Sequence, residues 1–74
     1  MIFPEIVKTV RAELKMSQED LARALNVSFA TINRWENGKT SPNKLTKTVF
    51  FDFCIKSGLD IDTFKSKEGG GHGV

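Results

Sequence analysis

Residues 17–39, SQEDLARALNVSFATINRWENGK, form the stretch that decides the fold of this chain. Ser17 precedes Asp20 by three residues, a spacing at which the hydroxyl caps a helix while the acid lies near the positive end of the helix dipole. Asn26 belongs to the non-glycine residue type that best tolerates a positive φ, so it predicts the end of this helix and a sharp reversal of the chain. Ser28 then predicts the cap of a second helix. The stretch therefore predicts two short helices joined by a tight turn.

The second of these helices has two faces of opposite character. At about 100° per residue, Ile32 and Trp35 share a side that must be buried. The other side carries short, amide and guanidinium side chains, from Ala30, Asn33, Arg34 and Asn37. Asparagine can form two hydrogen bonds to adenine and arginine two to guanine, so this side suits the reading of base edges. Polar helix faces are also typical of ordinary solvated surfaces, and it is the capped, sharply turned pair of helices that favours base reading here.

The segments MSQEDLA (16–22) and NVSFATINRWENGK (26–39), followed by Pro42, resemble in order and spacing a known family of proteins. This is the lambda-repressor-like, or Xre/Cro, family of bacterial and phage DNA-binding regulators. The resemblance spans residues 10–42. The family usually has glycine where this chain has Asn26, and asparagine is the next-best residue for a left-handed backbone. The resemblance implies an all-α fold, a compact lambda-repressor-like bundle of four to five helices that contains a helix-turn-helix.

The sequence before this stretch predicts one more helix. Pro4 suits a first helical position, and the helix is expected to run to about Lys15. Its apolar stripe consists of Phe3, Ile6, Val7, Val10 and Leu14. Arg11 lies near that stripe, and the family resemblance implies that it pairs with Glu36 across the edge of the core. The alternative is that both charges are solvated, as most surface charges are.

The sequence after the stretch predicts a fourth helix. Asn37-Gly38 is a stop signal, and Ser41-Pro42 predicts the cap and first turn of a helix from Asn43 to about Ser57 that closes at Gly58. The face expected to cover the core consists of Thr46, Val49, Phe50, Phe53 and Cys54. Phe51 and Ile55 lie on another side. Either a later segment folds back over them, through Leu59, Ile61 and Phe64, or they form an exposed patch for a partner.

Length and composition describe one small soluble domain. The chain has 74 residues, of which 39% are hydrophobic and 27% charged, and a net charge of +2. Residues 1–65 are the expected helix-turn-helix domain, with Asp60 or Asp62 capping a last turn near Lys65. Residues 66–74 are glycine-rich and without apolar periodicity, so we expect a disordered tail and assign His72 no function. The absence of a long apolar run excludes a membrane span, and the lack of a secretion signal predicts a cytoplasmic protein.

The resemblance predicts binding of double-stranded DNA, with the helix at 28–37 in the major groove and the helix at 17–25 across the backbone. The residues expected to contact bases are Phe29, Ala30, Asn33 and Arg34. Those expected to contact the DNA backbone are Ser17, Gln18, Ser28, Thr31, Asn37, Lys39, Thr40 and Lys44. Phe29 has an alternative placement, packed under the turn. The function predicted is that of a sequence-specific transcriptional regulator, a repressor, either alone or as a homodimer on a palindromic site.

Two other classes of function are alternatives to DNA binding. The first is a protein-interaction or antitoxin-like module that binds a protein partner through Phe51 and Ile55. The second is an enzyme, which the sequence disfavours because it has no nucleophile–base pair, no glycine-rich phosphate loop and no metal-ligand cluster. The single cysteine, Cys54, excludes an internal disulfide and is expected to be a buried apolar group. No metal and no cofactor is predicted.

Overall fold

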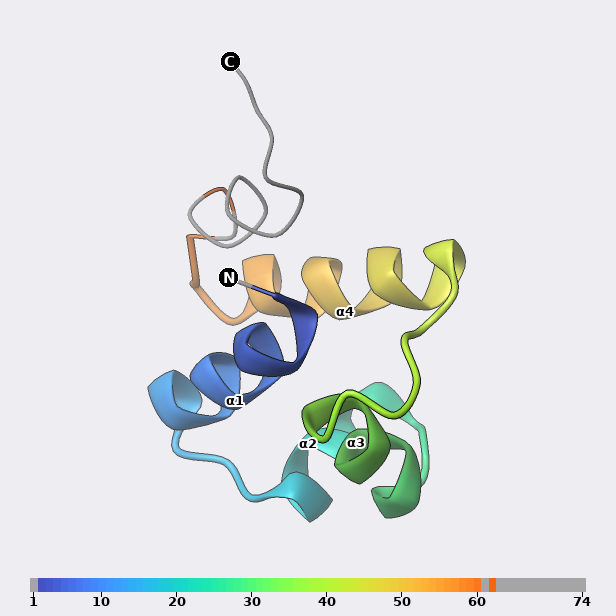
Figure 1. Ribbon diagram of the computed structural model, residues 1–74. Coiled ribbons are helices and arrows are strands. Elements are labelled where there is room, and N and C mark those ends of the chain that lie inside the picture. Colours follow the sequence, from blue (N-terminus) through green and yellow to red (C-terminus); the bar gives the residue numbers. More distant parts are fainter. Residues whose placement is uncertain (1, 61, 63–74) are drawn as a thin grey trace.

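A computed structural model describes residues 2–60 and 62, and this part of the chain contains helices and no strand. The helices are, in order, α1 (Phe3–Leu14), α2 (Gln18–Leu25), α3 (Phe29–Glu36) and α4 (Lys44–Lys56). Figure 1 shows α4 across one end of the molecule with α1 next to it, and α2 and α3 together at the other end. The segment 37–43 connects the end of α3 to the start of α4. The predicted all-α fold with a helix-turn-helix is confirmed.

The starts of the helices follow from local side chains. The Ser17 hydroxyl accepts a hydrogen bond from the Asp20 amide at 3.0 Å, and the Asp20 carboxylate accepts one from the Ser17 amide at 3.0 Å. This reciprocal pair is the predicted cap of α2. The Ser28 hydroxyl accepts from the Thr31 amide at 3.1 Å and so caps α3. Pro4 lies in the first turn of α1, where its missing amide leaves no hydrogen bond unmade.

The ends of all four described helices share one backbone pattern. A residue with left-handed backbone lies just past the end of each helix. Lys15 and Asn26 directly follow α1 and α2, and Gly38 and Gly58 come one residue later, after the caps of α3 and α4. The amide of the next residue then donates back to a carbonyl in the last turn of the helix, as from Val27 to Ala22 at 2.9 Å. These bonds satisfy carbonyls that have no partner within the helix. The predicted reversal at Asn26 and the predicted stop at Gly38 are confirmed, with φ angles of 60° and 72°.

The predicted range of α4 is right to within one residue, but its predicted cap, Ser41, is wrong by two residues. Asn43, not Ser41, is the cap: its side-chain oxygen accepts from the Thr46 amide at 2.8 Å, and the helix begins at Lys44. Asparagine caps a helix as well as serine does. A proline also disfavours helical backbone in the residue before it. Ser41, which precedes Pro42, accordingly lies outside the helix, in the segment that connects α3 to α4. Pro42 therefore precedes the helix.

One core receives side chains from all four helices. Its buried apolar residues are Phe3, Ile6, Val7, Val10, Leu21, Ala22, Ile32, Trp35, Phe50, Phe51 and Cys54. The Phe3 ring packs edge-on against Trp35 and Phe50, with centroid distances of 5.7 and 5.4 Å. Met16 and Val27, in the turns on either side of α2, are partly buried against this core. Phe3 thus joins the start of α1 to both α3 and α4.

The predicted buried side of α4 is also corrected. Phe51 is 7% exposed and packs against Phe3 and Phe50, whereas Val49, which was expected in the core, is 48% exposed. The cause is the start of α1, because Phe3 lies on the side of α4 that carries Phe51. The hypothetical partner patch of Phe51 and Ile55 therefore does not exist, although Ile55 itself is exposed.

Cys54 is fully buried in the core, as expected. Burial disfavours the thiolate and raises the pKa of this thiol to about 11. The thiol is therefore neutral at physiological pH and packs as a small apolar group.

The segment after α4 is described only in part. Leu59 is partly buried against the core, and the Asp62 amide donates to the Asp60 carboxylate at 3.2 Å. The expectations for Ile61, Phe64, the last turn near Lys65, the tail 66–74 and His72 lie outside the described residues.

Within residues 2–60 and 62, no group of three or more histidine, cysteine or acidic side chains is arranged to hold a metal ion. None of the four helices found there has both the length and the apolar character that a membrane crossing needs.

Candidate nucleic-acid interface

The core fixes the direction in which α3 faces. Ile32 is fully buried and Trp35 is 3% exposed, so one side of the helix is anchored. The other side is open to solvent and carries Phe29, Ala30, Arg34 and Asn37. Phe29 is 51% exposed, which excludes full packing under the turn. The structure therefore brings three of the four predicted base-contacting residues to an open surface.

Asn33, the fourth predicted base-contacting residue, is held by other side chains. Its amide nitrogen donates to the side-chain oxygen of Gln18 at 3.3 Å. Its amide oxygen accepts from the side-chain nitrogen of Asn37 at 3.0 Å. Asn33 is partly buried, and each end of its amide has one partner.

The start of α2 supplies two residues that were predicted to contact the DNA backbone. Ser17 is exposed, and its hydroxyl oxygen is the cap of α2. Gln18 is partly buried; its amide nitrogen donates to Glu36 at 3.0 Å and its oxygen accepts from Asn33. The hydroxyl proton of Ser17 is not needed for the cap and is available to a phosphate.

Two further hydroxyls lie at the start of α3. Ser28 is exposed and Thr31 is partly buried, and their hydroxyl oxygens are 2.8 Å apart. One of the two hydroxyls therefore donates to the other. The remaining proton points to no partner within this pair, so the pair keeps one donor for a phosphate.

The remaining predicted backbone contacts come from the segment after α3. Lys39 and Thr40 are exposed in the segment that leaves α3, and Lys44 is exposed at the first position of α4. Figure 1 shows this segment leading away from α3 to the start of α4.

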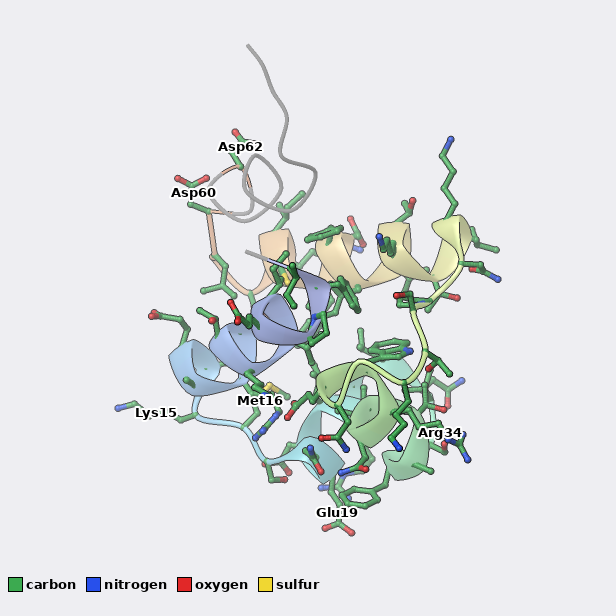
Figure 2. All side chains as sticks on the ribbon, viewed as in Figure 1. Lys15, Met16, Glu19, Arg34, Asp60 and Asp62 are labelled. Atoms are coloured by element: carbon green, nitrogen blue, oxygen red, sulfur yellow. The ribbon has the colours of Figure 1, made fainter. Side chains whose placement is uncertain are left out.

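The charge at this end of the molecule is mixed. Figure 2 shows Arg34 and Glu19 at the end formed by α2 and α3, and Asp60 and Asp62 at the far end beyond α4. Asp20 pairs with Arg23 at 2.9 Å on the exposed surface. The hydrogen bonds from Ser17 and the nearby Arg23 hold the pKa of Asp20 below its usual value, so it stays ionised at neutral pH. Cationic and anionic side chains therefore both lie at the end of the molecule formed by α2 and α3.

An ion pair lies directly beneath the interface and joins α1 to α3. The Arg11 guanidinium donates to the two carboxylate oxygens of Glu36 at 2.5 and 2.9 Å. Its third nitrogen donates to the Met16 carbonyl at 3.1 Å. The pair implied by the family resemblance is confirmed, and it is bidentate, the strong geometry for arginine and a carboxylate.

Glu36 remains charged although its side chain is only 5% exposed. Burial alone would raise the pKa of this carboxyl. The hydrogen bonds from Arg11 and Gln18, together with the charges of Arg11 and Lys8, outweigh burial and lower the pKa below its ordinary value. An ionised acceptor is therefore fixed under α3 at neutral pH.

Comparison with known families identifies this arrangement. A family model described as Helix-turn-helix matches residues 7–46, which is more than half of the chain and includes α2, α3 and the ion pair. The chain belongs to this helix-turn-helix family. Its lambda-repressor-like, or Xre/Cro, helix-turn-helix is a DNA-binding domain. The family is one of DNA-binding domains and not of enzymes.

One curated relative is similar to this helix-turn-helix chain. It is the type II methyltransferase M1.ScrFI of Lactococcus lactis subsp. cremoris, which is 39% identical over 51 residues. The match covers 65% of this chain and 13% of the relative, so the chain spans only a small part of that protein. No solved structure matches the chain.

Sequence reasoning missed the link from Glu36 through Gln18 to Asn33. The sequence predicts a DNA-backbone contact for Gln18 and a base contact for Asn33, and it predicts no contact between the two side chains. Gln18 and Asn33 are 15 residues apart, and Gln18 and Glu36 are 18 apart. No local spacing rule connects such positions, and only the packing of α2 on α3 brings them together.

Proposed function

We propose that this helix-turn-helix chain is a sequence-specific transcriptional regulator, a repressor, that binds double-stranded DNA with α3 in the major groove. The observation that carries the proposal is the open side of α3, where Phe29, Ala30 and Arg34 surround the hydrogen-bonded Asn33 while the other side is anchored in the core. In this docking geometry α2 crosses the DNA backbone. Repression requires only that the bound domain occupies its site.

The proposed contacts divide into two groups with different consequences. Phe29, Ala30, Asn33 and Arg34 contact bases and determine sequence preference. The DNA backbone is contacted by Ser17, Gln18, Ser28, Thr31, Asn37, Lys39, Thr40 and Lys44. These contacts position the protein and make its affinity depend on salt.

We also propose that the regulator acts as a homodimer on a palindromic site. A single domain of this kind reads one half-site, and two-fold dimers read half-sites separated by one helical turn of DNA. Leu45 and Val49 lie one turn apart on α4 and are 73% and 48% exposed. A second copy that covered α4 would remove these two apolar groups from water. The mass of the protein in solution tests this part of the proposal.

The similarity to a methyltransferase does not extend the proposal to catalysis. The match lies within 13% of that protein and corresponds to its helix-turn-helix part. We propose that this domain binds DNA without an enzymatic activity of its own and acts in the compartment that holds the DNA.

The first prediction is binding that weakens with salt. Fluorescence anisotropy of a labelled random duplex, titrated at several salt concentrations, should show a falling affinity. If about four phosphates are contacted per subunit, the slope of log affinity against log salt should be about −3.6. A folded protein whose affinity did not change with salt would contradict the proposal, and circular dichroism of the same sample shows whether it is folded.

The second prediction separates base contacts from backbone contacts. Arg34→Ala should lower affinity for an operator selected from a random pool by about 1–3 kcal/mol and relax preference at one base pair. Lys39→Ala is the matched control, since both side chains are exposed cations, and it should weaken all sequences alike. The measurement is the affinity for the operator and for its single-base variants. Equal effects of both changes on every sequence would show that the assigned roles are wrong.

A further inference from the structure

A chain of hydrogen bonds runs from the buried ion pair to the open side of α3. Arg11 donates to Glu36, and Gln18 donates to the same carboxylate at 3.0 Å. The Gln18 oxygen accepts from Asn33 at 3.3 Å, and the Asn33 oxygen accepts from Asn37 at 3.0 Å. Three helices are thus connected through side chains alone.

The direction of every bond in this chain is determined at its buried end. An ionised carboxylate only accepts hydrogen bonds, so Gln18 must turn its NH2 group toward Glu36 and its oxygen toward Asn33. Asn33 must then offer its NH2 group to Gln18 and its oxygen to Asn37. If the Asn33 amide were flipped, two oxygens would face each other at Gln18 and two NH2 groups at Asn37. The charge of Glu36 therefore selects one of two amide orientations that have nearly the same shape.

We infer that Gln18 is a positioning residue that holds the amide of Asn33 in one orientation for reading an adenine. This rests on the proposed function. Asn33 uses one N–H on Gln18 and one oxygen lone pair on Asn37, which leaves one N–H and one lone pair. A donor and an acceptor side by side are what the N7 and N6 groups of adenine require. Because the Asn33 amide already has one orientation in the free protein, binding to DNA does not carry the free-energy cost of ordering it.

This role differs from a phosphate contact in what it does to specificity. If Gln18 only bonded a phosphate, its loss would weaken every sequence by the same factor. If it orients Asn33, its loss lets the amide flip, and preference falls at the base pair that Asn33 reads. Methionine is a suitable replacement, because Gln18→Met keeps the length of the side chain and removes both of its hydrogen bonds.

The first test uses the free protein. The side-chain NH2 group of Asn33, followed by ¹⁵N NMR relaxation, should be ordered in the wild type and mobile in Gln18→Met. The backbone amides of α3 serve as the internal control and should be unchanged. An Asn33 side chain that is equally ordered in both proteins would overturn the positioning role, whether or not the protein binds DNA.

The second test uses the operator selected from a random pool and its single-base variants. Asn33→Ala should reduce discrimination at one A·T pair by roughly 5- to 150-fold. Gln18→Met should reduce discrimination at that same pair, and the double variant should lose no more of it than Asn33→Ala alone. Discrimination at that pair left unchanged by Gln18→Met, whether or not every sequence is weakened alike, or a change at another pair, would overturn the inference. Failure of all proteins to bind DNA would instead reject the proposed function, and the NMR result would still decide the positioning role.

Discussion

Trp35→Ala is expected to remove a large share of the unfolding free energy of this protein. Trp35 is 3% exposed and packs edge-on against Phe3 and Phe50, with centroid distances of 5.7 and 6.4 Å. Removing so large a buried side chain costs about 3–5 kcal/mol of unfolding free energy. A chain of this length has about 4–11 kcal/mol in total. Urea denaturation followed by circular dichroism should therefore show a much lower midpoint or no folded baseline.

Phe29→Ala is the matched control for this prediction. It removes another aromatic ring from the same helix, but that ring is 51% exposed. Its loss should change the unfolding free energy by less than about 1 kcal/mol. If Trp35→Ala unfolded at the same urea concentration as Phe29→Ala, the aromatic cluster would not be what holds α3 in place.

Local signals predicted the helix-turn-helix well because they depend on neighbouring residues. The reciprocal cap of Ser17 and Asp20, the cap by Ser28 and the left-handed Asn26 each involve groups within a few positions of one another. Residue type largely decides such geometry, since hydroxyls and amides bond nearby backbone groups. Helical periodicity likewise placed Ile32 and Trp35 inside and Arg34 outside.

Features that depend on distant residues were predicted less well. The buried side of α4 was misplaced because Phe3, from the start of α1, covers Phe51. A helical wheel gives the spacing of residues around one helix but not the position of its neighbour. The Arg11–Glu36 pair joins residues 25 apart and was anticipated only through the family resemblance. The bond from Gln18 to Asn33 had no such guide, and it changes how the candidate site is understood.

The ion pair beneath α3 leads to the other large expected effect. Arg11→Met should lower the unfolding free energy by about 3–5 kcal/mol, because it leaves the Glu36 carboxylate buried without its charged partner. The side chains of Arg11 and Glu36 are 24% and 5% exposed, so little water can replace the guanidinium. Glu36→Gln is the milder control, since its amide oxygen can still accept from Arg11. Replacing both residues by methionine should recover much of the loss, because no unpaired charge then remains.

The pH dependence of this loss identifies its cause. In the wild type the pKa of Glu36 is lowered, so its ionised form stabilises the fold above the unfolded pKa of about 4.3, and this contribution is lost as pH falls through the folded pKa. In Arg11→Met the main partner is gone while burial remains, so the folded pKa should lie above the unfolded value. As pH falls, protonation of Glu36 removes its unpaired buried charge, so the variant regains part of the unfolding free energy that it lost. The difference in unfolding free energy between the two proteins, measured by urea denaturation from pH 7 to pH 4, should therefore shrink. A difference that stayed constant over this range would show that lost packing of the Arg11 side chain, and not a stranded carboxylate, destabilises the variant.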